Sequence, residues 1–429
     1  MTEASRVTEK IHLGELDAVF SSLYGPDGET IIKQRARYAK TIENFERHYG
    51  AGRDISIYSA PGRVELCGNH TDHNNGVVMA AAVNLDVIAA VSKSGSGVIR
   101  LTSGGFPGED VVDLARLEPD TREFGKSRAM IRGVASAFRE RGGVIGAFDA
   151  YTESDVLKGS GLSSSAAFEI CVATIMNSEY NEGRFDSITL GIIGQYSENK
   201  FFGKPSGLMD QTTCAVGGAI SIDFEDPSSP VVSTVPLDLA SRGISLVVTD
   251  TKGDHSNLTG EYAAIRSEME RVALFFGKRC LREVDYETFK AGIAEVRLKT
   301  GDRAVLRAIH FFEECRRVRE AIASSGRGDI SRWLELMVEC GHSSFEFNQN
   351  AYSIKSPKRQ GISVGLAVSQ SILRGRGAWR LQGGGFAGTI QAFVPNELLD
   401  EYSTTMSGIF GSDACHVLRV RSFGGVKVI

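Results

Sequence analysis

A short stretch rich in glycine and serine constrains this 429-residue chain most. Residues 158–167 read Lys-Gly-Ser-Gly-Leu-Ser-Ser-Ser-Ala-Ala, and the apolar residues after them recur at helical spacing. The stretch therefore predicts a glycine-rich loop that opens onto the N-terminus of a helix. Free N–H groups and the helix dipole attract anions there, and glycine lets the backbone approach a phosphate closely. A surface loop that ends in a serine N-cap would show the same pattern. No Gly-Lys-Ser/Thr follows, so the stretch is not a P-loop of the usual form.

The composition excludes several classes of function. Hydrophobic residues make up 42% and charged residues 24% of the chain, as in ordinary globular proteins. The net charge is -5 and no basic block is present, which argues against binding to nucleic acid. The seven cysteines form no CxxC pair, which favours reduced thiols and a cytoplasmic location. The N-terminus has no apolar signal core and no apolar run is long enough to span a bilayer, so we expect no membrane partner.

A second polar stretch covers residues 62–76. It reads Gly-Arg-Val-Glu-Leu-Cys-Gly-Asn-His-Thr-Asp-His-Asn-Asn-Gly and holds Arg63, His70, Asp72 and His73 within eleven positions. So many donors and acceptors indicate a site for a hydroxyl-rich ligand. A metal site is one alternative, because His70 and Asp72 would share a face of a strand, although further ligands at the usual spacing are missing. A plain polar turn is another.

Two further stretches have two interpretations each. In residues 203–212, Pro205 and Gly207 predict a turn, and Asp210 in it is either a helix N-cap or a site residue. The second stretch, Gly-Gly-Gly-Phe-Ala-Gly at residues 383–388, lies between two predicted strands. It is either a backbone nest that holds an anion or a tight hairpin.

The order of elements predicts two domains. Residues 225–236 are rich in proline, serine and aspartate and form the predicted boundary, which gives an N-terminal domain 1–235 and a C-terminal domain 236–429. Residues 8–50 show helical spacing, and residues 416–428 alternate like one strand.

The order of these motifs resembles the galactokinase family. The motifs are Gly62-Arg63 with His70-Thr-Asp72, then Gly161-Leu-Ser-Ser-Ser-Ala166, Gly207-Leu-Met-Asp-Gln211 and Gly383-Gly-Gly-Phe-Ala-Gly388. The resemblance spans roughly residues 15–428. It places the chain in the superfamily of galactokinase, homoserine, mevalonate and phosphomevalonate (GHMP) kinases, which the glycine-serine motif marks. The Gly-Arg and His-Thr-Asp motif is specific to galactokinases.

The resemblance implies a fold and an activity. The fold is α+β, a two-domain GHMP-kinase fold with a ribosomal-protein-S5-like N-terminal domain, a ferredoxin-like C-terminal domain and the active site between them. The activity is transfer of the γ-phosphoryl group of ATP, with Mg²⁺, to the anomeric C1 hydroxyl of galactose, which gives galactose 1-phosphate. We expect no obligate protein partner.

The resemblance also implies residue roles that make physical sense for phosphoryl transfer. Asp210 matches the base, and the Arg63 guanidinium would keep it ionised and offset charge on the transferring group. Ser165 and Glu198 match the magnesium ligands, because a hydroxyl and a carboxylate beside phosphate oxygens are a common Mg²⁺ arrangement. The implied phosphate-binding loop consists of Gly159, Ser160, Gly161, Leu162, Ser163, Ser164 and Ser165. The implied sugar-binding positions are Arg63, Asn69, His70, Asp72, Gly207, Asp210 and Tyr262.

The chain departs from the family pattern at a few positions. Asn69 and His73 stand where galactokinases usually carry Glu and Tyr around His-Thr-Asp. The usual Glu accepts from the C6 hydroxyl of the sugar and would repel a C6 carboxylate, whereas Asn69 is neutral and also donates. Galacturonate is therefore an alternative substrate. Ser127 and Met130 replace aromatic residues expected near adenine, and Ser206 replaces a cysteine.

Two other classes of function remain as alternatives. One is a galactose- and ATP-binding sensor without turnover, although such proteins typically show damage in the glycine-serine loop, which is intact here. The other is a kinase for mevalonate or homoserine, against which the motif at Arg63, His70 and Asp72 argues.

Overall fold

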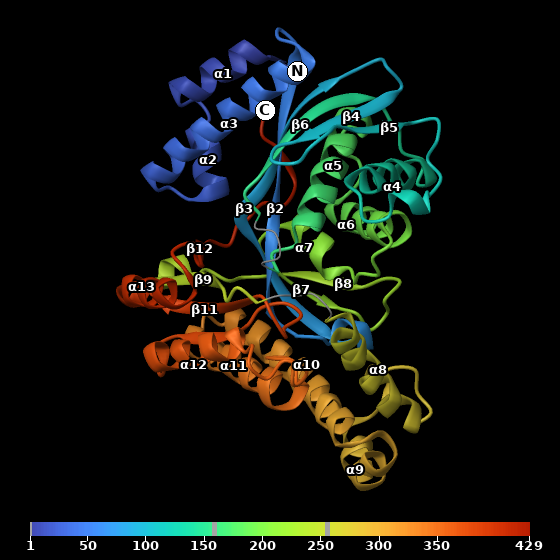
Figure 1. Cartoon of the computed structure of the whole chain (residues 1–429), viewed down its shortest axis with the longest axis vertical. Coiled ribbons are helices and arrows are strands. Elements are labelled where there is room, and N and C mark those ends of the chain that lie inside the picture. Colours follow the sequence, from blue (N-terminus) through green and yellow to red (C-terminus); the bar gives the residue numbers. More distant parts are fainter. Residues whose placement is uncertain (1, 157–160, 254–257) are drawn as a thin grey trace.

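The computed structural model describes residues 2–156, 161–253 and 258–429, and it contains two β-sheets (Figure 1). The nine-stranded first sheet has the main order β1 (Thr2–Glu3), β2 (Asp54–Cys67), β3 (Val77–Lys93), β6 (Phe148–Ser154), β4 (Val98–Ser103) and β5 (Asp110–Asp113). Its other strands are β7 (Ala219–Asp223), which pairs with β3, β8 (Val231–Val235), which pairs with β7, and β13 (Val426–Lys427), which pairs with β2. The second sheet is antiparallel and has the order β10 (Ala378–Leu381), β11 (Thr389–Pro395), β9 (Ile244–Asp250) and β12 (Cys415–Leu418).

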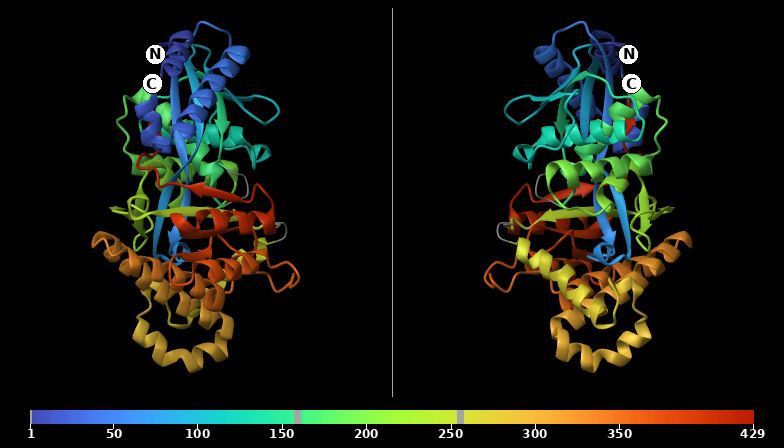
Figure 2. Two further views of the ribbon diagram at one scale, coloured as in Figure 1. Left: turned by 90° about the vertical axis from the view of Figure 1, so that its left-hand side faces the viewer. Right: turned by 90° about the vertical axis from the view of Figure 1, so that its right-hand side faces the viewer.

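Helices cover both faces of the first sheet (Figure 2). On one face lie α1 (Ala4–Leu13), α2 (Asp17–Tyr24) and α3 (Gly28–Tyr49), whose apolar residues pack on Ile55, Ile57 and Ile88. On the other lie α4 (Ser127–Glu140), α5 (Ser164–Asn181), α6 (Ser187–Ser197) and α7 (Met209–Val216). The helices predicted over residues 8–50 are confirmed, because their apolar spacing faces a buried sheet.

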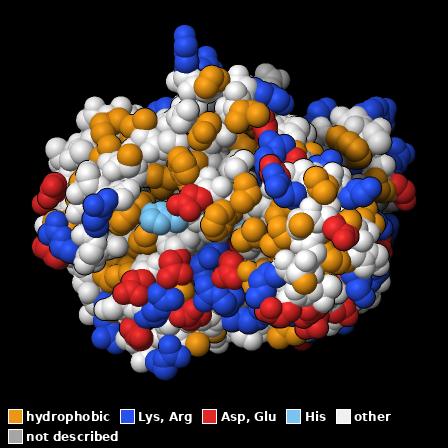
Figure 3. Space-filling model, turned by 90° about the horizontal axis from the view of Figure 1, so that it is seen from below, with side chains coloured by type: hydrophobic (Ala, Val, Ile, Leu, Met, Phe, Trp, Pro, Cys, Tyr) orange, Lys and Arg blue, Asp and Glu red, His pale blue; other side chains and the backbone are white. Residues whose placement is uncertain are grey.

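The remaining long helices follow β9 in the sequence, and the last three of them pack on the second sheet. They are α8 (Thr259–Phe275), α9 (Tyr286–Thr300), α10 (Asp302–Gly326), α11 (Ile330–Ser343), α12 (Gly361–Leu373) and α13 (Leu399–Phe410). The buried Trp333 of α11 packs edge-on against Phe393 of β11, with ring centroids 4.8 Å apart. Helices α8 and α9 form the lower end of the molecule in Figure 1. Seen from that end, acidic and basic side chains are mixed (Figure 3). Glu268 of α8 and Arg303 of α10 form an ion pair with an N–O distance of 2.6 Å. Among the described helices, none is long and apolar enough to cross a membrane.

Two irregularities in the pairing of β2 with β3 shape the site. The register shifts between Pro61 and Arg63 and again between Glu65 and Cys67. Such bulges bend a strand and re-aim its side chains, and they are common beside active sites. Arg63 and Glu65 thus stand on a distorted part of an otherwise regular strand.

The end of the chain differs from its prediction. Residues 416–428 form no single strand, because β12 belongs to the second sheet and β13 to the first. Between them the buried Arg421 guanidinium bonds the Asp86 carboxylate at 3.0 Å, and Gly424 and Gly425 follow. A buried ion pair and two glycines break the strand, and the apolar alternation alone could not reveal this. The division at residue 235 stays a prediction, and β13 returns to the first sheet.

Candidate active site

Arg63 and Asp210, which are 147 residues apart in sequence, form a bidentate ion pair. The Arg63 Nε donates to Asp210 Oδ1 at 2.7 Å and Nη2 donates to Oδ2 at 2.5 Å. Ser163 Oγ also donates to Asp210 Oδ2, at 2.7 Å. The Arg63 side chain is 9% exposed and that of Asp210 is 22% exposed, so the carboxylate faces solvent at the edge of the pair.

The ion pair keeps Asp210 charged. Burial alone would raise the pKa of Asp210, but the charge and hydrogen bonds of Arg63 and the Ser163 hydroxyl outweigh it and hold the pKa below its usual range. The carboxylate is therefore a proton acceptor at neutral pH. Asp210 lies in the first turn of α7, and of the two interpretations of this residue the structure favours a site residue over an N-cap.

The glycine-serine loop meets this pair at the start of α5. Arg63 Nη1 donates to the Gly161 carbonyl, and the Arg63 N–H donates to the Leu162 carbonyl at 3.0 Å. Gly161 and Ser163 both have left-handed backbone conformations, with φ of 70° and 58°. The chain turns sharply there into α5, as the sequence predicts. Gly159 and Ser160 lie outside the described residues.

A second carboxylate, Glu198, lies beside the same helix end. It is 1% exposed, it accepts from Ser165 Oγ at 3.0 Å and from Lys204 Nζ at 2.8 Å, and its other oxygen accepts from Gln211 Nε2 at 2.7 Å. Glu198 begins a π-helical turn, Glu198–Phe202, that directly follows α6. Such turns are frequent at functional sites. The predicted pair Ser165 and Glu198 is thus brought together.

The oxygens of this pair suit Mg²⁺, which prefers hard oxygen ligands and keeps places for phosphate and water. Among the described residues, no three His, Cys, Asp or Glu side chains gather as a metal-binding group. The two oxygens would therefore be completed by phosphate oxygens rather than by further protein ligands. A metal site was one alternative for the stretch around His70 and Asp72. The described residues there form no such group either.

The polar stretch around His70 and Asp72 lies next to the residues 383–385 and the turn before α7. His70 Nε2 donates to the Gly384 carbonyl at 3.0 Å. Asp72 Oδ2 faces Gly207 so closely that a Cβ there would lie 2.6 Å from it. Burial raises the pKa of Asp72, His70 opposes this shift, and the nearby Glu65 and Asp210 charges add to it.

Tyr262 of α8 contacts the same glycine-rich segment, residues 383–388. Its hydroxyl donates to the Gly385 carbonyl at 3.1 Å, and its ring lies over Gly384, where a Cβ would be 2.7 Å from Cε1. The glycines at 383–388 connect β10 to β11 in an antiparallel hairpin, with Leu381 opposite Ile390. This is the hairpin interpretation of the motif.

Comparison with known proteins agrees with this arrangement. The galactokinase galactose-binding signature matches residues 43–93, and the GHMP kinases N terminal domain matches residues 129–218. The galactokinase of Streptomyces coelicolor is 33% identical over 384 residues, which cover 88% of this chain and 94% of that protein. The galactokinase of Glaesserella parasuis is 32% identical over 357 residues, or 83% of this chain and 89% of that protein. The chain belongs to the galactokinase family.

Solved structures confirm the fold class. Lactococcus lactis galactokinase, solved in complex with galactose, superimposes with a TM-score of 0.77 at 21% identity over 91% of this chain and all of that one. Methanococcus jannaschii mevalonate kinase gives a TM-score of 0.61 at 14% identity over 86% of this chain and 98% of that one. The predicted α+β fold of the GHMP kinases is confirmed, and this protein is an ATP-dependent sugar kinase.

Asn69 has a smaller exposed fraction than the other predicted sugar-binding residues. It is 1% exposed, and its amide donates to Glu65 Oε1 at 3.0 Å and to the Gly383 carbonyl at 2.8 Å. Its Oδ1 accepts from Asn350 Nδ2 at 2.8 Å. These bonds hold the Asn69 side chain to Glu65, Gly383 and Asn350, and its place at the sugar stays a prediction.

Sequence reasoning missed several residues of the site. They are Glu65, Glu169, Lys204, Gln211, His310, Glu314, Asn350 and Arg380. Glu65, Lys204 and Gln211 lie inside the polar stretches 62–76 and 203–212, so their polar side chains were a usable signal. The others lie on helices, strands or loops whose local pattern is ordinary.

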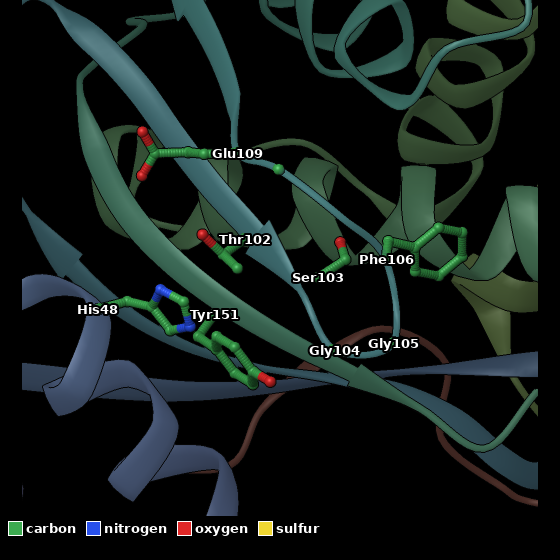
Figure 4. Close-up of a pocket in the computed structure, with 9 residues that line it drawn as sticks. His48, Thr102, Ser103, Gly104, Gly105, Phe106, Glu109 and Tyr151 are labelled. Atoms are coloured by element: carbon green, nitrogen blue, oxygen red, sulfur yellow. The ribbon is translucent and has the colours of Figure 1, made fainter.

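A separate pocket of about 360 Å³ lies between α3, β6 and the turn after β4 (Figure 4). The rings of His48 and Tyr151 stack at its wall with centroids 5.4 Å apart, and Phe106 and Glu109 border it. None of the predicted site residues lines this pocket, so it lies apart from the candidate active site.

Proposed function

We propose that this kinase transfers the γ-phosphoryl group of ATP to the C1 hydroxyl of galactose, which gives galactose 1-phosphate. The observation that carries the proposal is the ionised Asp210, bonded to Arg63 and Ser163 between the start of α5 and the His70 loop. Its relatives of 32–33% identity over most of the chain are galactokinases. Phosphoryl transfer needs a positioned acceptor for the hydroxyl proton and neutralised charge on the phosphate, and the pair can supply both.

Asp210 and Arg63 are the proposed catalytic residues. Asp210 takes the proton of the C1 hydroxyl as that oxygen attacks, and ionisation by Arg63 keeps the carboxylate ready to accept it. Arg63 also stabilises the negative charge on the transferring group. The bidentate geometry fixes the carboxylate, so little reorganisation is required at the moment of transfer.

The start of α5 is the proposed phosphate site. The loop 159–165 would supply backbone N–H groups to the phosphates, aided by the dipole of the 18-residue helix that follows. Ser165 and Glu198 would hold Mg²⁺, which neutralises phosphate charge when bound. Lys204, bonded to Glu198, keeps this carboxylate paired when the metal is not there.

The sugar site is proposed to comprise Arg63, His70, Asp72, Gly207, Asp210 and Tyr262, with Asn69 at its buried edge. The loop before α7 supports this group, because Gly207 of that loop lies against Asp72. Asp210 lies in α7 itself. The pattern of two carboxylates, one guanidinium, one imidazole, one phenol and a backbone approach suits a ligand with several hydroxyls.

A substrate panel tests the proposal. ATP turnover in a coupled assay is measured with galactose, galacturonate, N-acetylgalactosamine, glucose and arabinose, and phosphorus NMR locates the new phosphate. We expect galactose to have the highest kcat/KM and the phosphate to be on C1. Galacturonate as the preferred sugar would favour the alternative that Asn69 raises, and sugar binding without turnover would favour a sensor.

The location of this kinase is also proposed. All seven cysteines are free thiols, and six of them are buried. Reduced thiols persist in the cytoplasm, where ATP and Mg²⁺ are abundant, so we propose a cytoplasmic enzyme that needs no protein partner.

A further inference from the structure

Three successive carbonyls of the glycine turn Gly383–Gly385 accept hydrogen bonds from side chains of other segments. Asn69 Nδ2 donates to the first at 2.8 Å, His70 Nε2 to the second at 3.0 Å, and the Tyr262 hydroxyl to the third at 3.1 Å. His70 and Tyr262 are proposed sugar-binding residues, so the turn fixes the side chains that meet the substrate.

Asn69 is the most tightly held of the three donors. One amide hydrogen bonds the turn and the other bonds Glu65 Oε1 at 3.0 Å, while its Oδ1 accepts from Asn350 Nδ2 at 2.8 Å. Asn350 also donates to the Gly384 carbonyl, at 3.1 Å. Both amide hydrogens and the Oδ1 atom of Asn69 thus have hydrogen-bond partners within the protein. A buried amide that is bonded in this way favours one arrangement of the residues around it.

The groups that hold Asn69 are themselves anchored. Arg380 Nη2 donates to the same Glu65 Oε1 at 2.8 Å, so the carboxylate is held in place by a buried partner. The backbone of Asn69 is held as well, because His310 Nε2 donates to its carbonyl at 2.8 Å. Glu314 Oε1 accepts from the preceding N–H, of Gly68, at 3.0 Å. The amide is therefore a rigid link between β2 and the glycine turn.

From this geometry we propose that Asn69 is a positioning residue, which orders the glycine turn and through it the sugar-contacting side chains of His70 and Tyr262. The link needs two donors and one acceptor in one side chain, which an amide supplies and a carboxylate does not. A carboxylate at position 69 would face the Glu65 carboxylate and the Gly383 carbonyl, both of which only accept. The effect on sugar rests on the proposed sugar site, whereas the effect on the turn does not.

The isosteric variant Asn69→Asp removes the two donors and adds a negative charge beside Glu65. Hydrogen exchange at the amides of residues 383–388, read by mass spectrometry, is expected to accelerate by about tenfold or more, because the turn opens locally. The galactose KM is expected to rise by about tenfold while the ATP KM stays within about twofold, since loose side chains must be ordered on binding. Asn75→Asp is the matched control: it makes the same change six residues away in a left-handed position that Asp also tolerates, and it leaves exchange and both KM values unchanged.

A double variant separates lost donors from added charge. Glu65→Gln combined with Asn69→Asp restores the charge of the pair but gives the Gly383 carbonyl no donor from position 69, so fast exchange in the turn should persist. If Asn69→Asp does not fold, Asn69→Ser tests the same loss without any new charge. The proposal is overturned if the turn exchanges at the wild-type rate in Asn69→Asp or Asn69→Ser, or if the double variant restores slow exchange. If the enzyme proves inactive on galactose, the proposed function fails, and the exchange rates still decide the role of Asn69.

Discussion

Asp210 and Gln211 are neighbours in α7, and their side chains serve different partners. Asp210 accepts from Arg63 and Ser163, whereas Gln211 Nε2 donates to Glu198 Oε2 at 2.7 Å and to Glu169 Oε2 at 3.3 Å. Consecutive side chains on an α-helix point about 100° apart, because a turn takes 3.6 residues. One helical turn therefore sets the placement of the proposed base relative to the proposed magnesium carboxylate.

Asp210→Asn is expected to lower kcat by about a hundredfold or more, the usual scale for a lost positioned base. The amide cannot accept the sugar proton as a carboxylate does, but it has nearly the same shape and fills the same space. Calorimetry should still detect galactose and ATP binding. The exposed Asp226→Asn, in the loop after β7, serves as the control for the same change. Near-wild-type turnover in Asp210→Asn would remove this residue from the mechanism.

Glu198→Gln is expected to raise the Mg²⁺ concentration for half-maximal activity by about tenfold, because a neutral oxygen is a weaker magnesium ligand. The galactose KM should change much less. Metal binding is checked separately by titrating Mn²⁺ in the presence of a non-hydrolysable ATP analogue and following its EPR signal.

The nearby Glu169→Gln is a matched control for that variant. Burial raises the pKa of Glu169 well above its usual range, and the Glu198 charge adds to the shift, so its neutral form is favoured. Replacing Glu169 by an isosteric amide therefore changes the charge little, and the Mg²⁺ requirement should stay within about twofold. Equal effects of the two variants would show that both carboxyls, or neither, serve the metal.

Glu314→Gln is expected to destabilise the fold in a pH-dependent way. Burial would raise the pKa of Glu314, but the Arg317 guanidinium 2.9 Å away outweighs it and sets the pKa at about 2. A folded pKa below the unfolded value of about 4.3 adds stability above pH 5, about 3 kcal/mol here, and this is lost as the pH falls toward 2. Urea unfolding should show a variant weaker by about 3 kcal/mol at pH 7, with about half of the difference gone at pH 3 and most of it gone near pH 2.

The adjacent Glu313→Gln is the control for Glu314→Gln. Glu313 bonds Arg316 at 2.9 Å, but its side chain is 26% exposed and that of Arg316 is 52% exposed, so the loss should be about 1 kcal/mol or less. An equal loss in the two variants would mean that burial of Glu314 does not strengthen its ion pair.

The local motifs of the site could be predicted from the sequence. Arg63, Asp210 and Ser165 each lie in a stretch with an unusual density of polar residues or glycines, whereas Glu198 was implied by the family resemblance. The structure brings these residues together in the predicted pairs. Turn chemistry is local, so the glycine hairpin after β10 was also readable.

The network behind the site could not be predicted in this way. Asn69 and Asn350 are 281 residues apart, and Glu65 and Arg380 are 315 apart, so no local pattern connects either pair. His310 lies in a helix whose spacing indicates only a packing face. Long-range polar contacts depend on how the two sheets meet, which periodicity does not encode.

Asn69→Glu is a direct test of substrate choice. The sequence alone suggests that this change spares galactose and harms galacturonate. The structure leads to a different expectation, because the new carboxylate would lie about 3 Å from the Glu65 carboxylate, and like charges that close in a buried place repel strongly. We expect activity on both sugars to fall by about tenfold or more. Loss on galacturonate alone would show that position 69 faces the C6 end of the sugar.

Gly207→Ala tests whether Asp72 contacts the sugar. A Cβ at residue 207 would lie 2.6 Å from Asp72 Oδ2, well inside van der Waals contact, so the carboxylate must turn away. The galactose KM should rise by about tenfold, the scale of one lost hydrogen bond to a charged group, while the ATP KM stays the same. The control is Gly260→Ala near the start of α8, where, within the described part of the chain, a Cβ meets only Lys355 Nζ at 4.0 Å. That variant should keep both KM values. Its free energy of unfolding should rise by about a few tenths of a kcal/mol, because alanine favours a helix more than glycine does. An unchanged galactose KM in Gly207→Ala would mean that Asp72 holds the loop and does not bind the sugar.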